Sequence, residues 1–446
     1  MANIGAVNPF FHRTPVRDPA YFGGRQSELA QLCNLVRNGQ SVALIGPRRI
    51  GKSSLLWQIA HRLMTGAASH PPCCVVYFSG EAWQTQTSHA LYAGLWQALV
   101  MTLRAYGRAA TLPSLDAAVD ALEFPTFMHN LRQVTGAGVQ AVFLLDEFDA
   151  LSRNRHLDEF FFSSLRSLAA PLGVVYVTAS TRPLLELTYA QQSALSSPFF
   201  NIFLPHRLGL LPEREALSLL HEIAALGELK LSAAQQQLLR ELAGPHPCFL
   251  QIAGYHYWEA LRVGAADDLD HLRAAIYAEA APLWDYQWRH LATDEQRALA
   301  LLMTDFALPP GLLTRLRLTC LTQNSAGRAA LLSPLLARFV GQQAVYQILR
   351  AGPILIDQAS ELAWLHGASL ALAPQDYRLL VGLASAAGQP LSPAELATHL
   401  WPDDAASPNQ DRLKTAVNSL RNKLGSAHRD LVQHHNGGYR LVQTVQ

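Results

Sequence analysis

Glycines, a lysine and a serine near the N-terminus have the spacing of a loop that binds phosphate. They form the pattern Gly46-x-x-x-x-Gly51-Lys52-Ser53, which follows a short apolar run. In such a loop, backbone N–H groups and the start of the next helix receive phosphate oxygens, the lysine reaches the β- and γ-phosphates, and the serine hydroxyl binds Mg²⁺. The pattern predicts a site for ATP or ADP with Mg²⁺. Its expected nucleotide contacts are Gly46, Pro47, Arg48, Arg49, Ile50, Gly51, Lys52, Ser53 and Ser54.

Two acids end a second apolar run. Residues 141–145 are followed by Asp146 and Glu147. A carboxylate at the C-terminal end of a buried strand can hold the metal ion of a bound nucleotide, and we assign this role to Asp146. Glu147 is the candidate that polarises the attacking water. Asp149 is expected to be a solvated loop acid.

A third apolar run, residues 173–178, leads into Ser180, Thr181 and Arg182. Polar groups at the exit of a parallel strand face the same crevice as the phosphates, so Arg182 is expected to sense or neutralise the γ-phosphate. The alternative is that Arg182 only pairs with a nearby acid. The chain has no N-K-x-D element of the kind that reads guanine, which favours adenine.

The surrounding sequence predicts the elements that must position these groups. Residues 41–46 have the pattern of a strand, and a helical pattern begins at Lys52, so the loop joins a strand to a helix. Strand and helix patterns alternate to about residue 205, which is typical of a parallel sheet covered by helices. The predicted fold class is an α/β P-loop NTPase.

Composition narrows the class of protein. The chain has 446 residues, and at roughly 100–200 residues per domain this length indicates about three domains. The 35 Lys and Arg residues against 34 Asp and Glu exclude a global attraction to nucleic acid or membrane. The five cysteines form no C-x-x-C pair, as expected for reduced thiols in cytosol. No apolar run reaches about 18 residues and no secretion signal is found, so we expect a cytoplasmic protein without membrane contact.

Two flanking motifs resemble those of STAND-type signalling ATPases and related archaeal ATPases. Upstream, residues 21–29 (YFGGRQSEL) are similar to their F-h-G-R-x-x-E-L lead-in, and downstream residues 244–251 (GPHPCFLQ) are similar to their G-x-P element. By this resemblance Arg25 lies against the nucleotide. The resemblance also implies a helical lid after the sheet, in which Pro247 opens a lid helix and the proline or the histidine, His246, approaches the base or the diphosphate. It covers roughly residues 8–285.

The middle of the chain predicts a small helical domain. Thr293-Asp-Glu-Gln296 has the form of a capping box before an apolar helix, and residues 329–340 predict a second helix. A strand is predicted at residues 342–349. Short helices closed by a strand resemble the winged-helix unit that follows the lid in STAND proteins, where it mainly packs on the ATPase. Residues 351–367 are expected to form a leading sheet or a linker.

The C-terminal segment predicts a second winged helix. Ser392 with Glu395 and Ser407 with Gln410 form capping boxes, each with a proline at the first helical position. The order of elements over about residues 370–443 resembles the OmpR/PhoB-type winged helix of response regulators. This resemblance implies that the segment binds DNA.

The long helix that begins near Gln410 has the pattern of a DNA reader. Its apolar residues gather on one face at about 100° per residue, while amides, hydroxyls and cations occupy the rest. Amides and hydroxyls can read base edges, and cations can hold phosphates. The expected DNA contacts are Arg412, Lys414, Thr415, Asn418, Ser419, Arg421, Asn422, Lys423 and, near the C-terminus, Arg440.

The local charge balance leaves a second interpretation of this domain open. From residue 371 onward seven basic residues stand against six acids, so counterion release on DNA would be modest. Asp411 would also repel the phosphate backbone if it faced the groove. The alternative is a winged helix used for packing or for contact with a protein partner.

Together these features predict an ATP-dependent molecular switch of the STAND class. We expect ADP to hold the lid and helical domains closed on the sheet, and ATP, through Lys52, Asp146 and Arg182, to favour an opened or self-associated form. Slow hydrolysis to ADP and phosphate would reset the state. The predicted boundaries are a leader (1–20), a P-loop ATPase core (21–207), a helical lid (208–284), a first winged helix (285–350), a linker (351–369) and the OmpR/PhoB-type winged helix (370–446).

Such a switch with a DNA-binding tail would be a transcriptional or signalling regulator. Two other functions are compatible with the same motifs. An AAA+-like ATPase followed by winged helices also resembles replication initiators and transposition helpers, which load or mark DNA. A defence or signalling scaffold whose winged helices bind protein would need no DNA.

Overall fold

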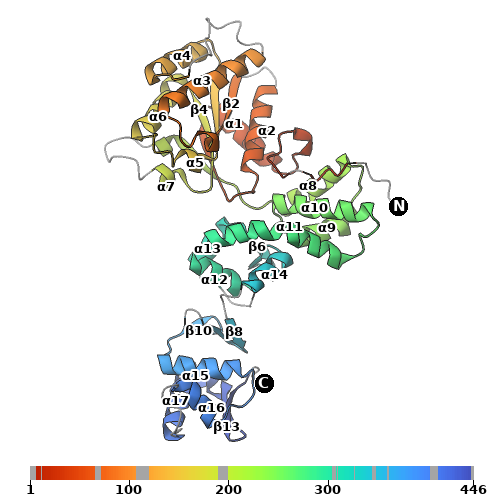
Figure 1. The fold of residues 1–446 in the computed structure, drawn as a ribbon, viewed down its shortest axis with the longest axis vertical. Helices are drawn as coiled ribbons and strands as arrows, with labels where there is room; N and C mark the ends of the chain where they lie inside the picture. The colour runs from red at the N-terminus through yellow and green to blue at the C-terminus, as the bar shows by residue number, and fades with distance from the viewer. Residues whose placement is uncertain are drawn as a thin grey trace. The chain divides into compact units, whose positions relative to one another are not determined.

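A computed structural model describes residues 7–11, 13–65, 72–106, 120–188, 199–303, 308, 310–325, 327–343, 348–358, 361–401 and 410–442. The chain divides into two compact units, one of residues 1–282 with 318–323 and one of residues 283–317 with 324–446. Figure 1 draws the elements of both units. None of the helices in the described ranges has the length and apolar character needed to span a membrane.

The first unit is built on a five-stranded parallel sheet in the order β2-β3-β4-β1-β5. Strand β1 is buried along its whole length, as expected for a parallel strand covered on both faces. Strand β4 lies between β1 and β3, so the strand before the P-loop and the strand that ends in Asp146 are second neighbours. The strands are β1 (Ser41–Ile45), β2 (Cys73–Ser79), β3 (Gln140–Asp146), β4 (Val175–Ser180) and β5 (Phe203–Arg207).

Helices cover both faces of this sheet. Successive side chains of a strand point to opposite faces, so Val42 and Leu44 pack with α1 and α2, whereas Ala43 and Ile45 pack with α3, α4 and α6. The predicted parallel sheet covered by helices is confirmed (Figure 1). The helices are α1 (Gln26–Arg37), α2 (Lys52–Thr65), α3 (Ser88–Ala105), α4 (Phe124–Gly136), α5 (Phe148–Leu151), α6 (Glu159–Leu172) and α7 (Leu184–Thr188).

Further helices follow the sheet, where the sequence predicted a helical lid. Helices α8, α9 and α10 pack against one another around buried leucines and aromatic residues. Ser232 and Gln235 form a capping box at the start of α9, and Pro247 is the first residue of α10. The helices are α8 (Glu213–Leu226), α9 (Ala233–Ala243), α10 (Pro247–Arg262) and α11 (Leu269–His290).

Three details of the middle segment differ from the sequence expectation. The helix predicted at residues 329–340 begins only at Pro334, because residues 328–331 form a strand. The predicted capping box at Thr293 is replaced by half of one a residue earlier: Ala292 is the extended N-cap and donates its N–H to the Glu295 carboxylate at 3.0 Å, but it has no side chain that could accept the reciprocal bond. Thr293 is already helical. The predicted strand at 342–349 is wrong at its start, where α14 continues to Gln342, and residues 344–347 lie outside the described ranges. The elements are α12 (Thr293–Leu301), α13 (Pro310–Leu318), β6 (Thr322–Ser325), β7 (Arg328–Leu331) and α14 (Pro334–Gln342).

A four-stranded antiparallel sheet occupies the segment for which the sequence left a sheet or a linker open. Its order is β11-β10-β9-β8, and it shares one hydrophobic core with the helices of the C-terminal domain. The strands are β8 (Ile348–Ala351), β9 (Ile354–Asp357), β10 (Leu362–Leu365) and β11 (Ala368–Leu370).

In its described residues the C-terminal domain has three α-helices and a β-hairpin. The capping box of Ser392 and Glu395 is confirmed, with the Glu395 carboxylate accepting from the Ser392 N–H at 2.7 Å. Ser407, predicted to cap the long helix, lies outside the described residues. The elements are α15 (Pro374–Ser385), α16 (Pro393–Leu400), α17 (Gln410–Leu424), β12 (Val432–His435) and β13 (Gly438–Leu441).

Candidate nucleotide site and candidate DNA surface

The P-loop joins β1 to α2 as the sequence predicted. Strand β1 ends at Ile45 and helix α2 begins at Lys52. Gly51 has a φ of 101°, a conformation that a residue with a side chain rarely adopts. A Cβ at Gly46 would lie 2.7 Å from the Leu208 carbonyl oxygen, so only glycine fits there. The loop is therefore a tight cradle of bare backbone at the N-terminus of a helix.

Lys52 is folded back onto this loop. Its ammonium donates to the carbonyls of Gly46 at 2.7 Å and Pro47 at 2.9 Å. Burial lowers the pKa of Lys52 to about 8, and the nearby charges of Asp149 and Asp146 oppose that shift. The lysine thus already sits over the cradle, held by carbonyls that an anionic phosphate oxygen would outcompete.

Strand β2 holds the two acids that end β3. Asp146 is 3% exposed, and its carboxylate accepts from the Tyr77 hydroxyl at 2.6 Å and from the Glu147 N–H at 2.9 Å. The Glu147 carboxylate accepts from the Ser79 hydroxyl at 2.8 Å. Burial raises the pKa of Glu147, and the Ser79 hydrogen bond opposes that shift. A raised pKa suits a group that takes a proton from water.

The end of β4 lies beside the P-loop. The Gly46 N–H donates to the Ser180 carbonyl at 3.2 Å, and the Ser180 hydroxyl donates to the Arg182 carbonyl at 2.7 Å. Arg182 itself is exposed. Asp149, expected to be a solvated loop acid, is instead half-buried, and its carboxylate accepts from the N–H and hydroxyl of Thr181 at 2.7 and 2.6 Å. That expectation is wrong because β4 places Thr181 against the turn after β3.

The residues present fit a nucleotide with Mg²⁺. The cradle offers N–H groups to phosphate, and Ser53 and Asp146 offer the hard oxygen donors that Mg²⁺ prefers. Among the described residues no group of three His, Cys, Asp or Glu side chains could hold a metal ion by itself. A magnesium ion here would therefore complete its coordination with phosphate and water oxygens, as it does in other phosphate sites.

Arg25 reaches the P-loop from inside the protein. It is 3% exposed, has a φ of 56°, and its guanidinium donates to the Ile50 carbonyl at 3.1 Å and the Gly209 carbonyl at 2.6 Å. Its backbone N–H donates to Glu215 of α8 at 2.8 Å. Arg25 thus ties the loop to the first lid helix, and its direct contact with nucleotide stays a prediction.

The residue before Pro247 is a buried, unpaired histidine. His246 is 1% exposed, and neither ring nitrogen has a hydrogen-bond partner within the described part of the chain. Burial, with a contribution from the Arg25 charge, lowers the pKa of His246 to about 3, so the ring is neutral. Pro247 is half-buried beside it. Two unsatisfied ring nitrogens next to a predicted ligand residue are consistent with a polar ligand group at this point.

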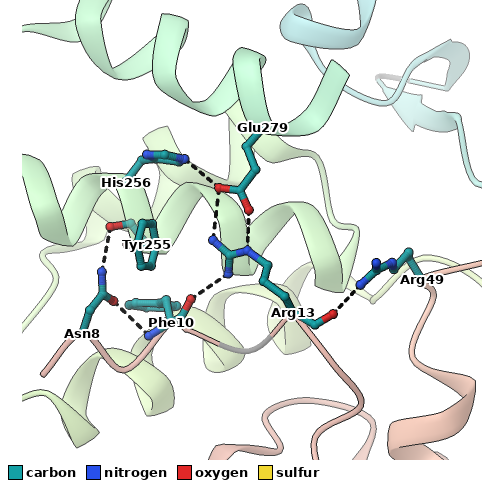
Figure 2. Close-up of polar contacts among 7 residues, drawn as sticks. All are labelled: Asn8, Phe10, Arg13, Arg49, Tyr255, His256 and Glu279. Carbon is teal, nitrogen blue, oxygen red and sulfur yellow. Dashed lines mark hydrogen bonds and ion pairs between the residues drawn. The ribbon is translucent and has the colours of Figure 1, made fainter. Parts of the chain in front are cut away.

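Residues 7–11 and 13–17, which we name the N-terminal strap, dock on the lid, although no sequence pattern indicated it (Figure 2). Phe10 is fully buried and lies against Gly254 of α10, where a Cβ would come within 2.5 Å of the ring. The Asn8 amide donates to the Tyr255 carbonyl at 3.0 Å. The only signal in the sequence is a phenylalanine pair in a segment without periodicity.

Charged groups continue the strap toward the P-loop (Figure 2). The Arg13 guanidinium forms an ion pair with Glu279 of α11, and His256 contacts the same carboxylate at 2.8 Å. The backbone carbonyl of Arg13 accepts a hydrogen bond from the Arg49 guanidinium. Arg13 alone therefore links the strap to the lid, through its side chain, and to the P-loop, through its backbone carbonyl.

The strap then runs along α2. The Val16 N–H donates to the Ser54 hydroxyl at 3.0 Å, and the Gln58 amide donates to the carbonyls of Val16 and Arg17. The Arg17 guanidinium lies over the Trp57 ring, 4.5 Å from its centroid. The leader predicted at residues 1–20 thus includes a strap that contacts the lid helices α10 and α11 as well as the P-loop and α2.

The predicted DNA contacts lie mostly on the exposed side of α17. Its apolar face, Leu413, Ala416, Val417, Leu420 and Leu424, is buried as predicted. The exposed residues are Arg412, Lys414, Thr415, Asn418, Asn422 and Lys423, and Ser419, Arg421 and Arg440 are half-buried.

Several of these cations already have partners. Arg421 donates to the Val432 carbonyl at 2.7 and 3.1 Å, and Arg440 donates to Gln433 at 3.1 Å. Arg412 lies over the Trp401 ring at 4.3 Å from its centroid. Arg421 therefore fixes the hairpin to the helix, a role that the sequence did not indicate.

Two family models match the chain. Residues 117–305 match Novel STAND NTPase 2, and residues 367–441 match Transcriptional regulatory protein, C terminal. Both resemblances drawn from the sequence are confirmed over these segments. No curated protein matches. The chain thus combines an NTPase domain with a C-terminal DNA-binding domain of the transcription-regulator type, while the P-loop itself lies before the first match and rests on its own geometry.

Solved structures show the same fold. The Walker-type ATPase PABY2304 of Pyrococcus abyssi is 16% identical, with a TM-score of 0.52 over 74% of this chain and 99% of that one. The Aeropyrum pernix ORC2 protein, solved as ADPNP-ADP complexes, is 14% identical, with a TM-score of 0.50 over 76% of this chain and 97% of that one. At these identities the likeness establishes the fold of a nucleotide-binding ATPase and nothing finer.

Proposed function

We propose that this chain, whose NTPase segment is of the STAND type, is an ATP-dependent molecular switch with a DNA-binding tail. The observation that carries the proposal is the position of Arg49. This P-loop arginine is bonded to the Arg13 carbonyl of the strap, and the strap is anchored in the lid by Phe10 and Glu279. A phosphate in the loop would compete for Arg49, so phosphate and lid would bias one another.

The residues divide the work as follows. Lys52 exchanges the Gly46 and Pro47 carbonyls for phosphate oxygens, and Ser53 and Asp146 hold the metal ion, which neutralises phosphate charge when bound. Glu147 orients the attacking water, and Arg182 senses or neutralises the charge of the γ-phosphate. Hydrolysis is slow and returns the protein to the ADP state.

The energy needed is within reach of these contacts. Moving a two-state equilibrium from mostly closed to mostly open requires a discrimination of about 5.5 kcal/mol. Hydrogen bonds to charged groups contribute about 1.5–3 kcal/mol each. Two or three contacts to the γ-phosphate, from Lys52, Arg49 and Arg182, would therefore suffice.

Nucleotide-dependent sedimentation tests this switch. The wild-type chain with Mg²⁺ and ATP should sediment differently from the chain with ADP, because opening or self-association changes its frictional ratio or mass. Lys52→Ala should give one profile with both nucleotides. Identical wild-type profiles with ATP, ADP and no nucleotide would count against the switch.

Two roles are possible for the DNA-binding tail, and a DNA-binding assay distinguishes them. A regulator binds one preferred sequence much more tightly than random DNA, whereas an ATPase that loads or marks DNA binds any sequence and is stimulated by ATP. The second role, an ATPase that loads or marks DNA, is retained as a candidate because the chain shares its ATPase fold with Aeropyrum pernix ORC2. A chain that binds no DNA at low salt would instead support the protein-binding scaffold.

A further inference from the structure

The side chain of Tyr77 joins the carboxylate of Asp146 to α2, the helix that follows the P-loop. It lies on β2, whose parallel register places Ser79 opposite Asp146 and Tyr77 opposite Leu144. Its hydroxyl donates to the Asp146 carboxylate at 2.6 Å. The other carboxylate oxygen accepts the Glu147 N–H, so each oxygen of Asp146 has one donor. These two bonds set the plane of the carboxylate.

The ring of Tyr77 is held by α2. It stacks on Trp57 with the centroids 4.3 Å apart and the planes 24° from parallel. Trp57 follows Ser53 by four residues, so the two lie one above the other on the same face of the helix. The Arg17 guanidinium covers the Trp57 ring. The stack therefore links the helix face that presents the Ser53 hydroxyl to the strand end that presents Asp146.

A bond of this kind does more than fill space. If this position only needed an aromatic ring to stack on Trp57, a phenylalanine would serve equally well. The hydroxyl of Tyr77 is therefore not needed for packing. A hydroxyl that donates to a carboxylate at 2.6 Å forms a charge-assisted bond, which is stronger and more directional than a neutral one. Groups that orient metal-binding carboxylates in this way tune metal affinity without touching the ion.

We propose that Tyr77 is a positioning residue for the magnesium-binding carboxylate, orienting Asp146 toward Ser53 through its stack on Trp57. The proposal rests on the proposed nucleotide site and adds a residue to it. Tyr77 does not contact nucleotide. It sets the magnesium concentration at which the site responds to ATP, and the strap, through Arg17, supports the stack from outside.

The test is a magnesium titration of ATP binding in the full chain. Tyr77→Phe keeps the ring and removes the hydroxyl, and a fluorescent ATP analogue reports binding. The magnesium concentration for half-maximal binding should rise about tenfold. Binding of the analogue without magnesium should stay unchanged, because Lys52 and the loop do not depend on Tyr77.

The chain offers a matched control. Tyr176 on β4 is fully buried, and its hydroxyl donates to the Leu165 carbonyl at 2.8 Å, far along the sheet from the acids. Tyr176→Phe removes a comparable hydrogen bond and should leave the magnesium midpoint at the wild-type value. Equal midpoints for wild type and Tyr77→Phe would overturn the proposal, and so would equal shifts for the two variants.

A second variant guards against a folding defect. Trp57→Leu keeps the phenol but removes its support, and should raise the midpoint by less than Tyr77→Phe does. A wild-type midpoint in a folded Trp57→Leu chain would contradict the part played by the stack. If the wild-type chain binds no ATP analogue at any magnesium concentration, the proposed nucleotide site fails first; if it binds with a magnesium dependence that Tyr77→Phe leaves intact, only this inference fails.

Discussion

The P-loop and helix α17 both offer positive charge to phosphate, yet they are built in opposite ways. In the P-loop the receiving groups are backbone N–H groups and a lysine that burial and two carbonyls hold in place. On α17 they are exposed side chains, and Arg421 and Arg412 also hold the hairpin and Trp401. The predicted phosphate-binding groups of the P-loop are therefore held by contacts within the loop, whereas the predicted DNA surface shares its side chains with the fold.

This difference predicts where substitutions act. Changes in the nucleotide half should alter stability or ATP binding and leave DNA binding alone. Changes on α17 should do the reverse, except where a side chain serves the fold.

The largest effect is expected for Phe10→Ala. Removing a fully buried ring leaves a cavity against α10, and such changes cost about 3–5 kcal/mol. Urea unfolding should show the loss in the transition of the first unit, with DNA binding unchanged. Phe11→Ala is the matched control, because Phe11 is 47% exposed, and it should cost about 1 kcal/mol or less. Similar losses for the two variants would contradict the assigned anchor.

Lys52→Ala should come next. The loss of a charged donor to the phosphates removes about 1.5–3 kcal/mol of binding free energy, or roughly 10- to 150-fold in ATP affinity by titration calorimetry. The fold should survive, because the lysine bonds only to loop carbonyls in the structure. Lys423→Ala on α17 serves as control, and a comparable loss of ATP affinity there would break the comparison.

On the DNA side, Asn418→Ala should weaken binding to a selected site by about 1–3 kcal/mol while random DNA is bound as before. Lys423→Ala should weaken binding to the selected site and to random DNA alike, and it should lower the slope of log affinity against log salt concentration by about one.

Arg421→Ala should destabilise the C-terminal domain, because it removes the hydrogen bonds to the Val432 carbonyl. Fluorescence anisotropy against salt concentration measures the effects of Asn418→Ala and Lys423→Ala, and urea unfolding measures that of Arg421→Ala. A salt-independent wild-type anisotropy signal would refute the DNA surface.

The smallest effect is a pH dependence of ATP binding. The pKa of Lys52 is about 8 in the free protein, and phosphate favours its charged form, so binding above about pH 8 must take up a proton. Affinity should fall about tenfold between about pH 7 and pH 9. Lys52→Arg keeps its charge and should show no such fall. A wild-type affinity that does not change over this pH range would show that the pKa of Lys52 is not lowered.

The same pKa has a consequence for stability. Folding lowers the pKa of Lys52, so the unfolded chain binds more protons than the folded chain between about pH 8 and the ordinary lysine value. The cost of burying this charge is present below about pH 8 and is relieved as the pH rises. As the pH rises above about 8, the free energy of unfolding of the first unit should therefore increase in the wild type relative to Lys52→Ala.

Local patterns were enough to locate the parts of the site. The P-loop, the acids after β3, the start of α2 and the capping box at Ser392 were all predicted, because each depends on residues a few positions apart. The register of one cap, the start of one helix and the start of one strand were missed. The hydrogen bonds of half-buried Asp149 were missed because its partner, Thr181, follows another strand.

How these parts are joined to one another was decided only by the tertiary structure, through contacts between distant segments. Phe10 against Gly254, Arg13 with Glu279, and Tyr77 on Trp57 beneath Asp146 join residues that no period or spacing relates. A motif records which groups can bind phosphate, because that chemistry is local to one turn of chain. The contacts on which the proposed coupling of phosphate to the lid rests form only when the sheet and helices bring the strap, the loop and α11 together, because packing and hydrogen bonding act through space.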